Sequence, residues 1–127
     1  MPLMPLKIEI ILNHLPYKEL SPNSRVHYMV KAKAVKALRK EAGWLAKDAW
    51  GDRTPIMSAR VSYHFYVRHH RHMDIDNLIA SMKSSLDGLV DGGLIMSDDV
   101  EHLELGQCTV TQSVQEQTII RVEILLR

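Results

Sequence analysis

The sequence has little cysteine and no long apolar run, and these two absences exclude several classes of protein. Its single cysteine, Cys108, excludes an intramolecular disulfide and a zinc site built from thiolates, which fits a reducing compartment. No segment reaches the roughly 20 apolar residues that a membrane-spanning helix needs. The N-terminus lacks the basic region of a secretory signal. We therefore expect a soluble, cytoplasmic protein with no membrane partner.

The chain also lacks a large excess of charge of either sign. Its 16 Lys and Arg residues nearly balance its 15 Asp and Glu residues, for a formal net charge of +1. Any affinity for nucleic acid must then come from local clusters of basic residues. With 46% hydrophobic and 24% charged residues in a chain of 127, the composition predicts one globular domain over residues 1–127.

The N-terminal half predicts a strand, a loop and a long helix. Residues 7–12 alternate and then run apolar, as in a strand, and residues 13–23 hold two prolines, as in a loop. A helix is expected from an N-cap at Asn23 or Ser24 to about Trp50. At about 100° per residue it has two opposite faces. The apolar face holds Val30, Ala34, Val35, Leu38, Ala42, Leu45 and Ala49, and the basic face holds Arg25, Lys33, Lys36, Arg39, Lys40 and Lys47.

The C-terminal half predicts a further helix between strands. Residues 60–68 alternate between apolar and polar side chains, which is the clearest strand pattern in the sequence. A helix of about three to four turns is expected from a cap at Asp74 or Asp76 to Gly92 and Gly93. Two strands joined by a polar turn are expected over residues 103–114 and 118–126. This order predicts an α+β fold, with a mixed or mostly antiparallel sheet packed against two main helices.

Residues 68–99 concentrate the groups that can do chemistry. Two carboxylates, Asp74 and Asp76, directly follow a basic and imidazole run, and a second acidic pair, Asp98 and Asp99, follows the glycines. The run consists of Arg68, His69, His70, Arg71 and His72. Carboxylate oxygens are the ligands that Mg²⁺ prefers, and cations beside them could hold a phosphate. The stretch therefore suggests a divalent metal site at which a phosphate docks.

Each of these features also has an ordinary structural explanation. Aspartates at a helix start often serve as a cap, an acidic pair after a glycine turn is often only a turn, and a basic helix face is often only solvated. The loop histidines lack an obvious fourth zinc ligand. An EF-hand calcium loop fails because Ile79 stands where its glycine belongs. The informative feature is the order in which the motifs follow one another.

That order runs through four short strings. They are Asp74-Ile75-Asp76-Asn77-Leu78 with Lys83 after it, Leu86-Asp87-Gly88-Leu89, Gly93-Leu94-Ile95, and Asp98-Asp99. Together they resemble the signature of the RusA family of Holliday-junction resolvases. An upstream segment is similar to the N-terminal Pro/Asn loop of that family, particularly in its phage-type members. It comprises Leu20-Ser21-Pro22-Asn23-Ser24 with Arg25 and His27.

The resemblance implies a homodimeric, Mg²⁺-dependent endonuclease that binds four-way DNA junctions and nicks two strands symmetrically. It assigns the metal to Asp74, Asp76 and Asp99, with Asp98 as a second candidate for the third ligand, and Mn²⁺ could substitute for Mg²⁺. The family's catalytic lysine usually lies four residues after the second aspartate, where this chain has an alanine. The resemblance therefore transfers that role to Lys83, nearly one helical turn further on.

The basic residues would then bind DNA backbone phosphates. We expect this of the run at residues 68–72 and of the basic helix face, in particular Lys33, Lys36 and Lys40. Because phosphate contacts carry no base information, selectivity should follow branched shape and weaken as salt rises. Two alternatives remain open: a branched-DNA-binding module without catalysis, and a small metal-binding or structural protein with no role on nucleic acid.

Overall fold

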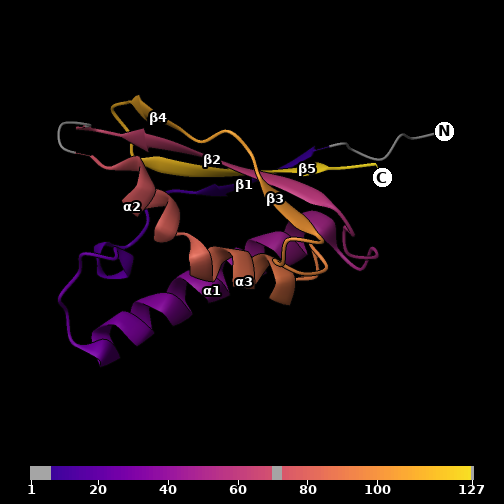
Figure 1. Cartoon of the computed structure of the whole chain (residues 1–127), viewed down its shortest axis with the longest axis horizontal. Coiled ribbons are helices and arrows are strands. Elements are labelled where there is room, and N and C mark those ends of the chain that lie inside the picture. Colours follow the sequence, from indigo (N-terminus) through magenta and orange to yellow (C-terminus); the bar gives the residue numbers. More distant parts are fainter. Residues whose placement is uncertain (1–6, 70–72, 127) are drawn as a thin grey trace.

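A mixed five-stranded sheet forms one layer of the structure and helices form the other (Figure 1). The structure is a computed structural model and describes residues 7–69 and 73–126. Its strands are β1 (Lys7–Leu12), β2 (Ala59–Val67), β3 (Leu103–Leu105), β4 (Thr109–Gln112) and β5 (Gln117–Ile124). Its helices are α1 (Tyr28–Trp50), α2 (Ile75–Ala80) and α3 (Lys83–Asp91), with a 3₁₀ turn η1 (Lys18–Leu20). The predicted α+β class, with a mixed sheet and two main helices in one small domain, is confirmed.

The strands are ordered β1-β5-β2-β3, and β4 also pairs with β2. β5 is antiparallel to both β1 and β2, whereas β3 and β4 are parallel to successive parts of β2. β3 and β4 thus replace the continuous strand expected over residues 103–114. The polar turn after β4 does not join neighbouring strands, because β2 lies between β4 and β5.

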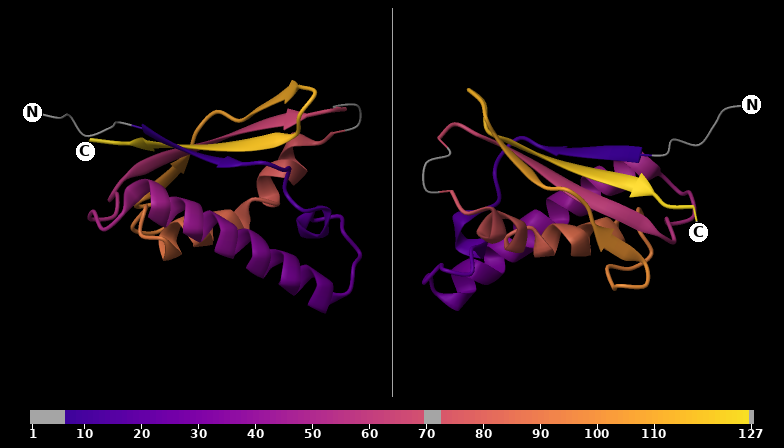
Figure 2. Two further views of the ribbon diagram at one scale, coloured as in Figure 1. Left: turned by 180° about the vertical axis from the view of Figure 1, so that it is seen from behind. Right: turned by 45° about the horizontal axis from the view of Figure 1, so that its top comes forward.

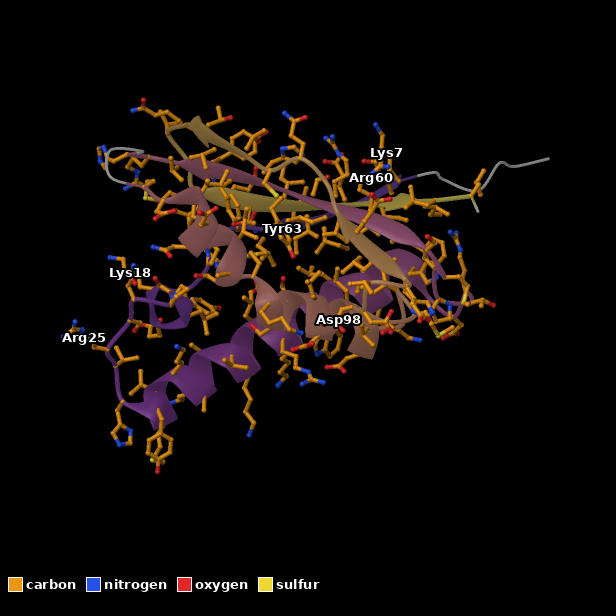
Figure 3. All side chains as sticks on the ribbon, in the orientation of Figure 1. Lys7, Lys18, Arg25, Arg60, Tyr63 and Asp98 are labelled. Carbon is orange, nitrogen blue, oxygen red and sulfur yellow. The ribbon has the colours of Figure 1, made fainter. Side chains whose placement is uncertain are left out.

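β2 forms the centre of the core, as its alternating pattern predicts. Val61, Tyr63, Phe65 and Val67 are buried on the face that the helices cover. Figure 3 shows Tyr63 between the sheet and the helices, and shows Arg60 and Lys7 on the other side of the sheet. The views in Figure 2 show that α1, α2 and α3 all lie on this one face. The candidate site is therefore built in the helix layer.

The N-cap of α1 lies three residues after Ser24 and four after Asn23, the two predicted caps. Ser24 forms a tight turn, in which its N–H donates to the carbonyl of Ser21 at 2.9 Å. His27 is the N-cap instead, and its Nδ1 accepts from the N–H of Met29 at 3.2 Å. The buried residues of α1 are Leu38, Ala42, Ala46 and Trp50. Val30 and Ala49, which were predicted to face the core, are exposed, and the first turns of α1 extend beyond the sheet (Figure 1).

The single helix expected before Gly92 is two helices, α2 and α3, with a break at Ser81 and Met82. Serine side chains bond to the backbone on both sides of this break. Ser81 Oγ donates to the carbonyl of Asn77 at 2.7 Å, and Ser85 Oγ donates to the carbonyl of Met82 at 2.5 Å. Such bonds compete with the helical ladder and bend helices. The break leaves Lys83 as the first residue of a new helix.

α3 packs closely on α1 through glycines. A Cβ atom placed on Gly88 would collide with the carbonyl oxygen of Arg39, and one placed on Gly92 would lie 2.5 Å from the carbonyl oxygen of Gly43. Only glycine permits this approach of the two backbones. At the edge of the contact, the guanidinium group of Arg39 donates to both carboxylate oxygens of Asp91, at 2.5 and 2.9 Å.

Replacing Gly88 with alanine should therefore destabilise the fold. The added methyl group would push α3 away from Arg39, and we expect a loss of about 2 kcal/mol in the free energy of unfolding, as for an overpacked core. Gly43→Ala is the matched control, because the nearest atom to its Cβ would be 3.3 Å away. Chemical denaturation of both variants measures the difference. Equal stability of Gly88→Ala and the parent would show that the helices are not held this closely.

Candidate active site

Lys83 lies between two carboxylates at the start of α3. Its Nζ donates to Asp87 Oδ1 at 2.9 Å, one helical turn further on, and to Asp98 Oδ2 at 2.6 Å. Asp98 comes from the loop that follows α3, and Figure 3 shows it beside that helix. The hydrogen bond to Asp98 is the main cause that raises the pKa of Lys83, and the same bond lowers the pKa of Asp98. The lysine is therefore held in its charged form.

The side chain of Asp99 is bonded within its own loop. Its side chain accepts from Ser97 Oγ at 2.9 Å and from the N–H of Glu101 at 3.0 Å, and it lies 2.8 Å from His102 Nδ1. The bond with His102 is the main cause that lowers the pKa of Asp99. Of the two adjacent aspartates, Asp98 contacts the lysine and Asp99 organises the turn.

Asp74 and Asp76 lie at the start of α2. Asp74, one of the two residues predicted as a cap, is the N-cap of that helix. Its Oδ1 accepts from the N–H of Asp76 at 3.0 Å. Both side chains are exposed. Within the described ranges, no three His, Cys, Asp or Glu side chains stand together as a group that could hold a metal ion. The structure thus does not gather Asp74, Asp76 and Asp99 into one ligand set, and their role as ligands stays a prediction.

An open groove of about 1080 Å³ brings the N-terminal Pro/Asn loop against the start of α2. Asp74 and Asn77 form part of one wall and Asn23 lies on the loop side. Figure 3 shows Lys18 and Arg25 in the segment between β1 and α1. Two segments of the RusA-like pattern that are about 50 residues apart in sequence therefore share one groove. The residues that line it are His14, Leu15, Pro16, Tyr17, Lys18, Glu19, Ser21, Asn23, Ser24, Val26, His69, Met73, Asp74, Asn77, Leu78, Ser81 and Glu116.

His14 and Tyr17 hold this loop in place, and sequence reasoning missed both. The two rings are stacked with their centroids 5.0 Å apart. His14 Nε2 lies 2.7 Å from Glu41 Oε1 on α1, which ties the loop to that helix. Burial is the main cause that raises the pKa of the Tyr17 hydroxyl.

The sequence patterns also assigned no role to Asp87. Its spacing of four residues from Lys83 on one helix is the signal that could have predicted their contact.

The predicted phosphate-binding residues lie on two different elements. Lys33, Lys36 and Lys40 are exposed on α1, whereas Arg68 and His69 are exposed directly after β2. The rest of the basic run lies outside the described residues, namely His70, Arg71 and His72. The described side chains thus offer two basic surfaces, one in the helix layer and one at an end of the sheet.

Comparison with known proteins places the chain in a family. No family model matches the sequence. An uncharacterized protein of Xylella fastidiosa strain Temecula1 is 32% identical over 114 residues, which cover 80% of this chain and 74% of that relative. The chain belongs to the family of this protein. Because the relative is described only as uncharacterized, the activity has to be argued from the site.

The described part of the chain contains no helix with the length and apolar character needed to cross a membrane.

The ion pair at Lys83 can be tested by titration. Lys83→Ala removes the bond that lowers the pKa of Asp98, so we expect this pKa to rise toward its ordinary value. A lowered carboxyl pKa stabilises the fold at pH values above the unfolded-state pKa, and this contribution is lost as pH falls through the folded-state pKa. The variant should therefore lose less stability on acidification. Carboxyl ¹³C NMR measures the shift. Arg39→Ala, which disrupts the separate pair with Asp91, should leave Asp98 unchanged.

Proposed function

We propose that this protein is a Mg²⁺-dependent, structure-selective endodeoxyribonuclease that resolves four-way DNA junctions by paired, symmetric nicks. The observation that carries the proposal is the contact of Lys83 Nζ with both Asp87 and Asp98. The contact with Asp87 follows from helical spacing, but Asp98 belongs to a separate string of the RusA-like pattern and meets Lys83 at the same point of the surface. A chance likeness between short strings would not require them to be neighbours in the fold.

The donors near Lys83 are of the kind that Mg²⁺ binds. Mg²⁺ takes oxygen ligands and keeps several waters, so one or two carboxylates suffice when substrate phosphates supply the rest. Asp87 and Asp98 already direct two carboxylate oxygens at one cationic group, the lysine ammonium. The resemblance assigns the ion to Asp74, Asp76 and Asp99, and these three carboxylates would have to come together around it, because they are not grouped in the described structure. When bound, the ion would activate a water and offset negative charge on the scissile phosphate.

The chain's own groups would bind and orient the substrate. The side chain of Lys83 is 65% exposed, so a phosphate oxygen can reach its ammonium group. Asp87 and Asp98 fix the direction of that group, which is the condition for stabilising charge as it develops. Lys33, Lys36 and Lys40 would contact backbone phosphates, together with the basic run after β2. A homodimer would supply two such sites, one for each strand that is cut.

Cleavage of a labelled synthetic four-way junction, with and without Mg²⁺, tests the activity. We expect paired symmetric nicks that need the metal, and we expect Asp76→Asn to lose them while junction binding is kept. Asp48→Asn is the matched control, because Asp48 is an exposed carboxylate on α1 that belongs to none of the RusA-like strings. Binding without cleavage by the parent, with either Mg²⁺ or Mn²⁺, would favour a module without catalysis. If the parent does not bind junctions at all, both the enzyme and the binding module without catalysis are excluded.

The assigned role of Lys83 makes a separate kinetic prediction. Lys83→Ala should lower the rate of the cleavage step by about 100-fold or more, as expected for the loss of one group that stabilises developing charge. Junction affinity should change little. Single-turnover cleavage at saturating enzyme separates the two effects. Lys7→Ala removes a cation on the other side of the sheet from the helices and should cleave at the parental rate. Parental cleavage by Lys83→Ala would show that the lysine role has been wrongly transferred.

A further inference from the structure

The outer face of α1 carries an exposed aromatic residue that the proposed active site does not use. The side chain of Trp44 is 71% exposed, whereas the other tryptophan of the chain, Trp50, is 2% exposed and part of the core. Leaving a large apolar ring in water gains nothing for folding. Tryptophan is enriched at binding surfaces, because its ring offers a large apolar area together with a polar N–H group.

Lysines surround Trp44 along the helix. At about 100° per residue, Lys33, Lys36, Lys40, Trp44 and Lys47 fall within about 80° of one another, and with a rise of about 1.5 Å per residue they extend over about 21 Å. All five side chains are exposed. We call these five residues the α1 stripe. Trp44 lies one turn after Lys40 and nearly one turn before Lys47, so a positive charge stands on each side of the ring.

The surface is hollow on two sides of Trp44. One hollow, of about 330 Å³, is lined by Lys40, Gly43, Trp44 and Lys47 among others. A second, of about 550 Å³, is lined by Ile11, Ala37, Lys40 and Trp44 among others. Trp44 and Lys40 belong to both hollows. A flat ring can therefore approach the indole while a group attached to it reaches a lysine.

The carboxylates that line these two hollows are already paired with basic side chains. Asp91 is bound by Arg39, and Glu41 by His14. Lys47 is itself paired with Asp52 at 2.6 Å, but Asp52 is 95% exposed, and such surface pairs exchange easily. The α1 stripe thus presents available positive charge beside an aromatic face. This combination suits an anionic chain that carries flat rings.

We propose that the α1 stripe binds an unpaired DNA strand, with a base stacked on Trp44 and phosphates facing the lysines. In a duplex the base faces are already stacked on one another, so only an unpaired segment offers one to the indole. The inference takes its class of partner from the proposed function, because a branched DNA whose strands open at the branch supplies unpaired bases. It concerns a different surface from the one that contains Lys83.

Binding of a fluorescently labelled single-stranded oligonucleotide in EDTA, compared with the matching duplex, tests this. Trp44→Ala should weaken single-strand binding about tenfold, within the range for one stacked base, and change duplex binding less than twofold. Trp44→Phe should recover most of the affinity. Tyr28→Ala is the matched control, because Tyr28 is a 74% exposed aromatic on α1 that lies outside the α1 stripe. It should bind as the parent does.

Tryptophan emission gives a second readout. Single strands should quench the parent, and should not quench Trp44→Phe, whose remaining tryptophan is buried. Unchanged single-strand binding by Trp44→Ala would overturn the proposal. The proposal would also be overturned if the tryptophan emission changed with protein concentration and not with added oligonucleotide, because a second copy of the chain would then cover the ring. Because these measurements exclude divalent metal, a protein that binds strands but never cleaves would refute the proposed function alone.

Discussion

The close approach of α3 to α1 is the constraint on which the candidate site depends. Gly88 on α3 and Gly92, the C-cap residue that follows it, lie one turn apart and let the backbone of α3 rest against that of α1. The same short helix begins with Lys83, carries Asp87 one turn later, and leads into the loop that supplies Asp98. Gly88, which is part of a RusA-like string in the sequence, therefore also acts as a packing residue. The position of the lysine follows from a contact made on the other side of the helix.

The break between α2 and α3 is the second constraint. A continuous helix would have kept Asp76 and Lys83 on one face, since they are seven residues apart. The bonds of Ser81 and Ser85 to the backbone lie on the two sides of the break between α2 and α3. Asp74, at the start of α2, lies beside the Pro/Asn loop, and Lys83 lies beside Asp98. The acidic residues of the pattern are thereby divided between two neighbouring places. In the proposed enzyme, the bound metal and substrate would join them.

Local patterns were sufficient for most of the fold. The alternation of β2 predicted its buried face, and the bounds expected for β1 match those found. What failed depended on contacts between distant residues. Val30 fits the apolar face of α1, yet it is exposed on turns that extend beyond the sheet. The turn after β4 looked like a hairpin because sequence spacing does not reveal that β2 lies between β4 and β5.

The same distinction applies to the site. Spacing could place Lys83 and Asp87 on one helix face, but which of Asp98 and Asp99 meets the lysine depends on the turn formed by Ser97, Glu101 and His102. The groove could not have been predicted either, since the stacked rings of His14 and Tyr17 reach it from a loop that has no periodic pattern. Residues that pack in a helix or strand recur at a regular spacing, so the sequence predicts them. Residues whose position depends on the conformation of a loop have no such spacing, so the sequence does not predict their contacts.

A protein that binds DNA next to carboxylates must prevent them from repelling the phosphates. Here the carboxylates around α3 are each bonded to a basic side chain: Asp87 and Asp98 to Lys83, Asp91 to Arg39, and Asp99 to His102. On the outer face of α1, the four lysines of the α1 stripe then outnumber Asp48, the exposed acidic residue of that helix. A chain with a net charge of only +1 can in this way present a locally positive surface to a polyanion. If the proposed function holds, the affinity of the protein for DNA would depend on how its acidic residues are paired and would not need an excess of basic ones.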